Sequence, residues 1–416
     1  MTDTLGQRHW MTAPATAAVF DALEAEGGPD CARFVGGCVR NALVGRPIDD
    51  IDIATTLTPE RVKTALGRAK IRAVPTGIEH GTITAVSDHT PHEITTLRRD
   101  VSTDGRRATV AFTEDWVEDA LRRDFTLNAL YARRDGSIYD PTGQGVADAK
   151  AGRIVFVGDA EQRLAEDHLR NLRYFRFYAW FGKGAPDAAA VAACSKLKNG
   201  VETLAAERIS KELLKLLAAD DPRAAVRLMA EAGVLEVVLK AQADLARFEA
   251  FVEVETDQLF ECDPVLRLAA LLPDDQVAAM ALATRLRLAN AERDRIVAAL
   301  SPTPELKSWM SPREIRREVY RTGKPVFRDR AKLAWAASPR TATTMQWRGM
   351  IALAEGWTPP ELPLSGAEII NAGVPKGPLV GEVMREVEAW WIDNDFIDDK
   401  LSVIEKLKAV AQGMVY

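Results

Sequence analysis

The sequence is poor in several features, and each scarcity excludes a class of protein. Its 416 residues contain only 4 cysteines, which form no Cys-x-x-Cys pair and no plausible zinc quartet. No apolar run approaches the length of a membrane span, and the N-terminal segment lacks the apolar core of a signal peptide. We therefore expect a cytoplasmic protein with reduced thiols and no membrane association.

Histidine is scarce as well, and the chain has no excess of positive charge. All 5 histidines precede residue 170, so the C-terminal half cannot supply the metal site of a His-Asp phosphohydrolase. The sequence also has no Gly-x-x-x-x-Gly-Lys-Ser/Thr phosphate loop. The formal net charge of -6 argues against a generally basic nucleic-acid binder, so any contact with RNA must come from local patches.

The patterns that are present divide the chain into two kinds of structure. The first part begins with a short amphipathic helix within residues 1–30, followed by predicted strands at 83–86, 93–97, 109–112 and 137–140. From about residue 160 the spacing of apolar residues is helical, with proline-bearing breaks at 263–264, 301–304, 358–363 and 375–378. These patterns predict a small mixed α/β unit followed by a helical body of more than one domain.

The most informative stretch begins at Gly36 and Gly37, which follow a short apolar run and precede Arg40. Glycines at such a turn let backbone N–H groups approach a phosphate, and a helix that starts there points its positive end at the anion. Asp50 and Asp52 alternate with isoleucines, so on a strand they share one face. Two carboxylates beside a phosphate-binding turn favour metal-dependent phosphoryl or nucleotidyl transfer over a solvated turn.

This stretch, GGCVRNALVGRPIDDIDIATTLTPERV, resembles the opening of the class II tRNA nucleotidyltransferase (CCA-adding enzyme) and bacterial poly(A) polymerase superfamily, related to DNA polymerase beta. The usual pattern is GGxVRDxLLGRxxxDxDxAT, and this chain has Asn41 where the family most often has Asp. The substitution leaves the two metal carboxylates unchanged. The resemblance continues in the family's order through residues 94–100, 118–130, 165–177 and 207–217.

The resemblance implies an α+β fold, in which a nucleotidyltransferase head with a small mixed sheet precedes an elongated all-α neck, body and tail. We expect the catalytic head at 1–145, the neck that selects the base at 146–217, a tRNA-binding body at 218–335 and the tail at 336–416. The implied activity is template-independent addition or repair of the 3′-terminal CCA of tRNA from CTP and ATP, with release of pyrophosphate. Its partners would be the tRNA 3′ end and the two nucleotides. The sequence leaves the oligomeric state open.

The resemblance also implies a metal centre. Asp50 and Asp52 are expected to hold two Mg²⁺ ions, of which one lowers the pKa of the primer hydroxyl and the other bridges triphosphate oxygens. Relatives of DNA polymerase beta often add a third catalytic carboxylate from a nearby strand. Glu93 is the candidate by its order in the chain, and an exposed strand end explains it equally well.

Further motifs are assigned to nucleotide binding beside Gly36, Gly37 and Arg40. Arg98, Arg99 and Asp100 resemble the family's ribose-recognition motif, in which a carboxylate accepts from the 2′-hydroxyl and guanidinium groups meet phosphate. Without that context the triplet would be a solvated charge run. The third motif contributes Asp119, Arg122 and Arg123 and is associated with coupled motion of head and neck. The following Phe125, Leu127 and Leu130 are expected in the core.

Base selection is assigned to Asp167 and Arg170, which match the family's Glu-Asp-x-x-Arg motif. Three residues apart, they would share one face of a helix and present an acceptor beside a fork of donors. Cytosine and adenine both offer an amino donor beside a ring-nitrogen acceptor, whereas guanine and uracil reverse that order, so one Asp/Arg pair can accept C and A. The alternative is a helix salt bridge. Arg173, in the same motif, completes the nucleotide-binding set.

Two alternatives to CCA addition stay open from the sequence. A poly(A) polymerase shares the head motifs, although its tail is often strongly basic and this one is not. A non-catalytic RNA-binding protein on the same scaffold would be expected to have lost Asp50 and Asp52, which are both present. For RNA, residues 285–332 hold 13 basic residues against six acidic ones, which indicates a phosphate-binding surface or solvated helix faces. Trp390 and Trp391 in the tail are expected to pack.

Overall fold

The computed structural model describes residues 3–104, 107–338, 344–396 and 399–414. Its internal contacts divide the chain into two compact units, Met1–Ala243 and Asp244–Tyr416, and each is described by itself. The four domains expected from the sequence, with their three boundaries, stay predictions. Within the described residues, no helix combines the length and the apolar character that a bilayer crossing requires.

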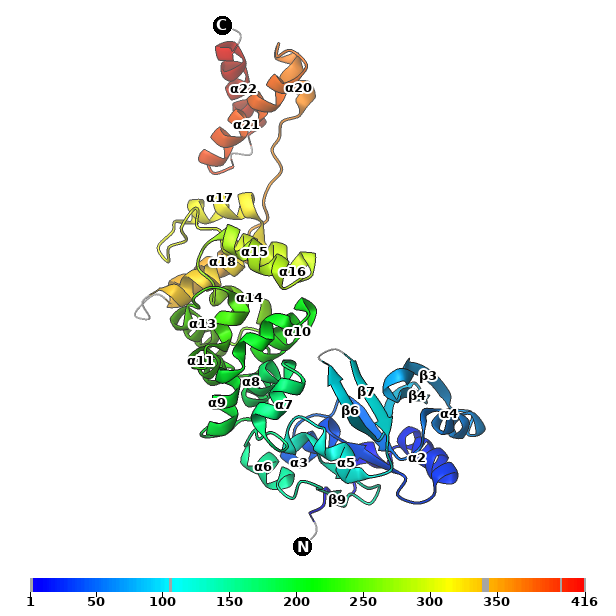
Figure 1. Cartoon of the computed structure of the whole chain (residues 1–416). Coiled ribbons are helices and arrows are strands. Elements are labelled where there is room, and N and C mark those ends of the chain that lie inside the picture. The colour runs from blue at the N-terminus through cyan, green and yellow to red at the C-terminus, as the bar shows by residue number, and fades with distance from the viewer. Residues whose placement is uncertain (1–2, 105–106, 339–343, 397–398, 415–416) are drawn as a thin grey trace. The chain divides into compact units, whose positions relative to one another are not determined.

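The first unit holds every strand that the structure describes (Figure 1). The strands are β1 (Ala32–Val35), β2 (Ile51–Thr55), β3 (Arg72–Gly77), β4 (Thr82–Ser87), β5 (Thr90–Thr96), β6 (Arg98–Asp104), β7 (Arg107–Phe112), β8 (Tyr131–Ala132) and β9 (Ile138–Tyr139). The helices among them are α1 (His9–Thr12), α2 (Pro14–Gly27), α3 (Gly37–Val44), α4 (Pro59–Arg68), η1 (Ile78–His80), α5 (Trp116–Leu121) and η2 (Thr126–Asn128).

Seven of these strands form one mixed sheet in the order β3-β4-β5-β2-β1-β8-β9, and β6 pairs with β7 in a separate ribbon. Only the β2–β5 pair is parallel. Side chains alternate between the two faces of a strand, so the register assigns each row to one face. One row is fully apolar and buried, with Phe34, Ile53, Ile94 and Ile83 as neighbours on four strands.

The adjacent row of the same strands is polar. Asp52 in β2 is the register partner of Glu93 in β5, which in turn is the partner of Thr84 in β4. The apolar row packs under α2, where the rings of Phe20 and Phe34 are 4.5 Å apart. The polar row therefore occupies the opposite face of the sheet, and the alternation of Asp and Ile in β2 is what separates the two.

The rest of the first unit is helical. Its elements are α6 (Gly145–Ala151), α7 (Ala160–Glu166), α8 (Leu169–Phe181), α9 (Ala188–Lys196), η3 (Lys198–Thr203), α10 (Ala206–Leu217), α11 (Arg223–Glu231) and α12 (Val234–Leu239). Helix α8 packs against α10 and α11. It also meets the head through its aromatic side chains, because Phe177 lies 5.1 Å from Phe125, ring centre to ring centre.

The second unit is all-helical over its described residues. Its helices are α13 (Leu245–Asp257), α14 (Pro264–Ala270), α15 (Gln276–Arg285), α16 (Asn290–Ala299), α17 (Pro312–Thr322), α18 (Lys324–Ala337), α19 (Thr344–Gly356), α20 (Gly366–Asn371), α21 (Pro378–Asp393) and α22 (Lys400–Met414). Reciprocal capping boxes begin two of them, Ser311 with Glu314 at α17 and Ser365 with Glu368 at α20.

The predicted fold class, an α+β protein with a small mixed sheet in an N-terminal nucleotidyltransferase head, is confirmed. All four predicted strands are present, with bounds extended by a few residues or, at 137–140, shortened to Ile138–Tyr139. Phe125, Leu127 and Leu130 are buried as expected. Trp391 is buried in a core with Val383 and Phe396, which confirms packing for that side chain.

Candidate active site

Three acidic residues lie at or beside the polar face of the sheet. Asp50 is exposed just before β2, Asp52 is partly buried within β2, and Glu93 is the exposed register partner of Asp52 on β5. Burial, followed by the charges of Glu93 and Asp50, raises the pKa of Asp52 to about 6. At neutral pH the three form a concentration of negative charge that a bound cation would relieve.

The glycine turn lies directly beside Asp52. Strand β1 ends at Val35, Gly36 adopts φ 67° and ψ -117°, and α3 begins at Gly37. That backbone conformation is open to glycine and strained for other residues. A Cβ on Gly37 would lie 4.0 Å from Asp52 Oδ2 and 3.8 Å from Arg40 Nη2, and one on Gly36 would lie 3.6 Å from Arg123 Nη1. The turn therefore joins a carboxylate, two guanidinium groups and a helix N-terminus at one point.

Arg40 is held by neutral groups. Its Nε and Nη2 donate to Asn41 Oδ1 at 3.1 and 2.8 Å, and its Nη1 donates to Asn128 Oδ1. The guanidinium also lies 4.1 Å from the ring centre of Phe181, a cation–π contact supplied by α8. Burial, and after it the charge of Arg176, lowers the pKa of Arg40 to about 10, so it stays charged at neutral pH. Neutral acceptors fix its position and leave its charge for a ligand.

Asp119 is a buried hub for the third motif. Its side chain is 1% exposed and accepts hydrogen bonds from Arg122, from Arg123, from the Tyr131 hydroxyl and from the backbone N–H of Arg98. All four donors are groups of the protein itself, so the carboxylate is satisfied without a ligand. The structure thus gives Asp119 a positioning role in the predicted nucleotide site, since it holds the Arg123 guanidinium beside Gly36.

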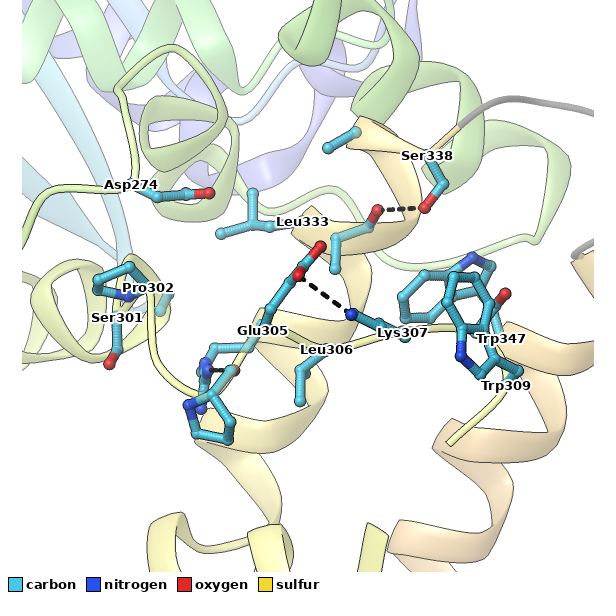
Figure 2. Close-up of a pocket in the computed structure, with 16 residues that line it drawn as sticks. Asp274, Ser301, Pro302, Glu305, Leu306, Lys307, Trp309, Leu333, Ser338 and Trp347 are labelled. Atoms are coloured by element: carbon cyan, nitrogen blue, oxygen red, sulfur yellow. Dashed lines mark hydrogen bonds and ion pairs between the residues drawn. The ribbon is translucent and has the colours of Figure 1, made fainter. Parts of the chain in front are cut away.

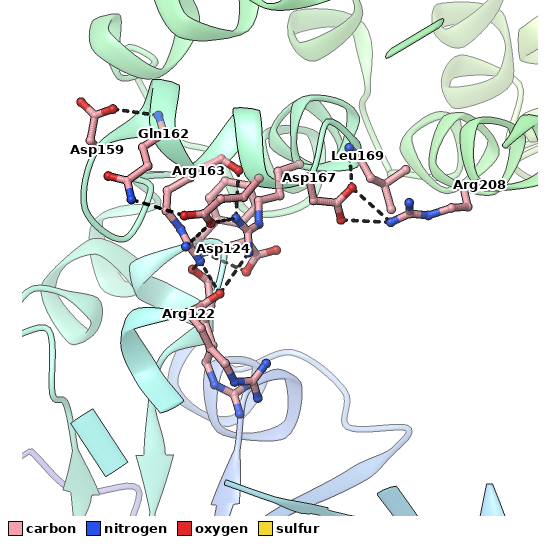
Figure 3. Close-up of polar contacts among 12 residues, drawn as sticks. Arg122, Asp124, Asp159, Gln162, Arg163, Asp167, Leu169 and Arg208 are labelled. Carbon is pink, nitrogen blue, oxygen red and sulfur yellow. Dashed lines mark hydrogen bonds and ion pairs between the residues drawn. The ribbon is translucent and has the colours of Figure 1, made fainter. Parts of the chain in front are cut away.

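Helices α7 and α8 contact the same motif through hydrogen bonds to its main chain. Arg163 donates to the backbone oxygens of Arg122 and Arg123, and Arg170 donates to that of Arg122 at 3.1 Å (Figure 3). Glu166 pairs with both Arg163 and Arg170 and so keeps the two guanidinium groups together. Arg170, one of the two residues predicted to select the base, is therefore directly connected to the head motif.

The expectation that Asp167 and Arg170 share one face of a helix is wrong. Asp167 has extended backbone, φ -149° and ψ 105°, between the end of α7 and the start of α8. Its carboxylate accepts from the backbone N–H of Leu169 and from Arg208 Nη2, the latter at 3.0 Å (Figure 3). Helix spacing failed here because the helix is interrupted at Asp167, and in the described part of the chain no ion pair joins Asp167 to Arg170.

Arg173, one turn further along α8, is also paired. It meets Asp124 with Nε and Nη2, at 2.7 and 2.5 Å, and reaches Glu212 at 3.9 Å. Burial alone would raise the pKa of Asp124, but the Arg173 charge and a hydrogen bond from Asn128 lower it to about 2. The pair links Asp124 in the head to helix α8.

The triplet predicted to recognise the ribose, residues 98–100, lies on the β6–β7 ribbon. Arg98 and Arg99 are in β6, and Arg99 is 4.0 Å from Glu118. Arg98 donates to the backbone oxygen of His80. Asp100 is the register partner of Val110, and its side chain lies outside the described residues.

Asn128, Phe181 and Arg208 were not among the residues predicted from the sequence. Asn128 and Phe181 act on Arg40 from far along the chain, so no local pattern reveals them. Arg208 is within the recognised stretch 207–217 but had received no role.

The basic stretch at 285–332 is less available than its composition suggested. Arg316 and Arg317 pair with Asp395 and Asp393. Arg295 and Arg330 are likewise neutralised, by Asp263 and Asp329 and by Glu318. Among the described residues no ion pair is found for the exposed Arg313 and Arg321.

The donor set fits a hard divalent cation. The described residues contain no group of three or more His, Cys, Asp or Glu side chains close enough to hold a metal. Mg²⁺ does not require such a group, because it is often bound through one or two carboxylates completed by water and substrate phosphate oxygens. Asp50 and Asp52 supply that number of carboxylates, beside the glycine turn.

Comparison with known proteins decides the family. A family model described as the poly A polymerase head domain matches residues 32–155, and one described as a probable RNA and SrmB-binding site of polymerase A matches 186–245. The mitochondrial CCA tRNA nucleotidyltransferase 1 of Mus musculus is 33% identical over 396 residues, covering 90% of this chain and 86% of that protein. The chain belongs to the CCA tRNA nucleotidyltransferase family.

Other members of the family agree. The CCA-adding enzyme of Latilactobacillus sakei is 31% identical over 373 residues, covering 89% of this chain and 91% of that protein. The crystal structure of the Bacillus stearothermophilus CCA-adding enzyme in complex with CTP matches with a TM-score of 0.73 at 25% identity, over 97% of this chain and 99% of that one. The chain is accordingly a nucleotidyltransferase, of a family that depends on a divalent metal.

The Asp119 hub gives a prediction for this family member. Asp119→Asn keeps the shape of the side chain but removes the buried charge between Arg122 and Arg123, so we expect the free energy of unfolding at pH 7 to fall by roughly 3 kcal/mol. Burial raises the pKa of Asp119, but the Arg123 and Arg122 charges and a hydrogen bond from Tyr131 bring it well below its unfolded value of 3.8.

Because the folded pKa is depressed, this contribution is complete above the unfolded pKa and is lost as the pH falls toward the folded one. Urea unfolding should therefore separate variant from wild type at pH 7, and the difference should shrink progressively as the pH falls below about 4. Glu114→Gln, at an exposed neighbouring position, is the control. Equal midpoints for Asp119→Asn and wild type at pH 7 would contradict the role of the hub.

Proposed function

We propose that this chain adds or repairs the 3′-terminal CCA of tRNA, using CTP and ATP and releasing pyrophosphate. One observation carries the proposal: Asp52, the Gly36–Gly37 turn and the guanidinium groups of Arg40 and Arg123 meet at one point of the head. Acidic groups for a metal and cationic groups for a triphosphate, side by side, are what transfer of a nucleotide to a hydroxyl requires.

In this proposal each residue has a role at a stated atom. The triphosphate accepts hydrogen bonds from the N-terminus of α3, and Arg40 and Arg123 offset its negative charge. Together these groups orient the α-phosphorus toward the RNA 3′-oxygen. Asp50 and Asp52 would hold Mg²⁺, and Glu93 would add charge behind Asp52. The bound metal would lower the pKa of the attacking hydroxyl and neutralise phosphate charge. The RNA 3′-oxygen forms a bond to the α-phosphorus as the bond from that phosphorus to the β-phosphate oxygen breaks. The hydroxyl proton passes to solvent, and pyrophosphate leaves with its charge stabilised by the two guanidinium groups.

The remaining assignments complete the nucleotide site. Arg98, Arg99 and Asp100 on the ribbon would meet the ribose and phosphates. Asp167 would accept from the amino group of C or A, and Arg170 would donate to the adjacent ring nitrogen. In the structure the Asp167 carboxylate contacts Arg208, so a base would have to replace that contact. Cytoplasmic localisation stays a prediction, consistent with the buried thiols of Cys31, Cys38 and Cys194.

The activity is tested with single nucleotides. The chain is incubated with tRNA that ends at the discriminator base, with tRNA ending in C and with tRNA ending in CC, each with one nucleotide at a time. CCA addition predicts C, C and A on the three substrates in turn. A long run of A on the first substrate, without prior C, would identify a poly(A) polymerase instead.

The metal assignment predicts the behaviour of Asp52→Asn. Loss of the ligand charge should reduce nucleotide incorporation by about a hundredfold or more, while tRNA binding is retained. Chelation by EDTA should abolish incorporation by the wild type, and added Mg²⁺ should restore it. Asp49→Asn, an exposed aspartate just outside the site, is the matched control. Retention of more than about a tenth of the wild-type rate, an effect of only ~1.4 kcal/mol, would show that Asp52 is not a metal ligand.

The Arg40 contacts predict that lysine cannot replace this arginine. Arg40→Lys keeps the charge but loses the planar stack on Phe181 and the fork toward Asn41 and Asn128. We expect KM for both CTP and ATP to rise by about tenfold with little change in melting temperature, because the triphosphate loses a fixed donor. The measurement is steady-state kinetics on tRNA lacking CCA. An unchanged KM for both nucleotides would exclude Arg40 from triphosphate binding.

The base-selection proposal predicts coupled losses. Arg170→Ala and Asp167→Ala should each lower incorporation of C and of A together and weaken discrimination against U and G, since the groups those bases leave unpaired are gone. Arg163→Ala is the control for Arg170, because it shares the contact with the Arg122 carbonyl but has no assigned base contact. Normal selectivity in Arg170→Ala, or the same loss of selectivity in Arg163→Ala, would show that Arg170 has only a structural role.

A further inference from the structure

A cavity of about 330 Å³ lies in the second unit, and none of the residues that line it is assigned to nucleotide transfer (Figure 2). It is lined by the loop between α16 and α17, by the C-terminal half of α18 and by α19. Its walls include Pro302, Lys307, Trp309, Leu333 and Trp347. The volume exceeds what one water molecule needs and is of the size that accommodates a single aromatic ring.

Two tryptophans give the cavity its chemical character. Trp309 is 73% exposed, which is unusual for so large an apolar side chain. Trp347 is 1% exposed, and its indole N–H finds no hydrogen-bond acceptor among the described residues. A buried N–H without a partner costs free energy, and a ligand that brings an acceptor into the cavity would recover it.

The charge at the cavity mouth is mixed. Lys307 Nζ lies 5.9 Å from the ring centre of Trp309 and 3.5 Å from a Glu305 carboxylate oxygen, both in the same loop (Figure 2). Arg330, also in the wall, is neutralised by Glu318 and donates to the backbone oxygen of Pro304. Lys307 is thus the cation in the wall that stays partly exposed, next to an open aromatic face.

We propose that this cavity binds one unpaired nucleobase of an RNA, stacked on Trp309, with a base acceptor on the Trp347 N–H and Lys307 near the adjoining phosphate. The inference rests on the proposed function, which supplies RNA as the partner. An exposed aromatic face, a cation beside it and a buried donor are the elements with which proteins hold single-stranded nucleotides.

An unpaired base fits these elements better than a paired one. In a duplex both faces of a base are covered by its neighbours, and only phosphate and groove edges are offered to the protein. Contacts to phosphate need several unpaired cations. Within 285–332, however, four arginines are already paired with carboxylates: Arg295, Arg316, Arg317 and Arg330. The cavity instead offers one stacking surface and one donor.

The test compares two RNA probes on the full chain without nucleotides and with EDTA: fluorescently labelled hexauridylate and a blunt, fully paired RNA duplex. Trp309→Ala should weaken binding of hexauridylate by about fivefold or more, since stacking is lost, and change duplex binding by less than about twofold. Trp309→Phe should restore part of the affinity. Val277→Ala, also exposed and in the same unit but outside the cavity, should match the wild type.

A second readout locates the base. Hexauridylate should quench part of the tryptophan emission of the wild type, and Trp309→Phe should lose that part while it still binds. Trp347→Phe removes the N–H together with the five-membered ring that carries it, and it should also weaken hexauridylate binding. If Trp347→Phe lowers the melting temperature strongly, the Trp309 series decides alone, because Trp309 is largely exposed and its replacement leaves the core intact.

Three results would overturn the proposal: no detectable binding of hexauridylate, equal affinity of Trp309→Ala and wild type for it, or an equal loss for hexauridylate and duplex. These outcomes are separate from failure of the proposed function. If the wild type incorporates C, C and A but Trp309→Ala binds hexauridylate normally, CCA addition stands and the nucleobase pocket does not.

Discussion

The buried carboxylate of Asp119 is the constraint on which the arrangement of the head depends. It fixes the start of the β6–β7 ribbon through the Arg98 N–H, the glycine turn through Arg123 and strand β8 through Tyr131. One negative charge thus sets the positions of three elements that are distant in sequence. Because Asp119 is isolated from solvent, its low-dielectric surroundings strengthen the ion pairs and hydrogen bonds of its carboxylate. Without those partners the buried charge would be costly.

Much of the head could be predicted from the sequence because its signals are local. The Asp-Ile alternation of β2 assigns carboxylates and core to opposite faces, and the glycine pair marks a turn that other residues cannot adopt. Both follow from the geometry of a few consecutive residues. The predicted nearness of Asp52 to the turn has the same origin, since only α3 and one loop separate them.

What the sequence could not predict depends on distant partners. Asp167 was expected on a helix, but the helix ends one residue earlier and Arg208 pairs with its carboxylate. The arginines of α17 suggested an open basic surface, yet Asp393 and Asp395 neutralise two of them from far along the chain. A count of charges within a window contains no information about partners outside it, so it overestimates the charge available to RNA.

Part of the contact between α7, α8 and the head is made to main-chain oxygens. Arg163 and Arg170 donate to the carbonyls of Arg122 and Arg123 rather than to their side chains. Every residue type carries the same carbonyl, so these hydrogen bonds depend on the path of the backbone and not on which side chains stand at 122 and 123. The side chains at 122 and 123 can therefore differ in chemistry without weakening the hydrogen bonds that join this part of the head to α7 and α8.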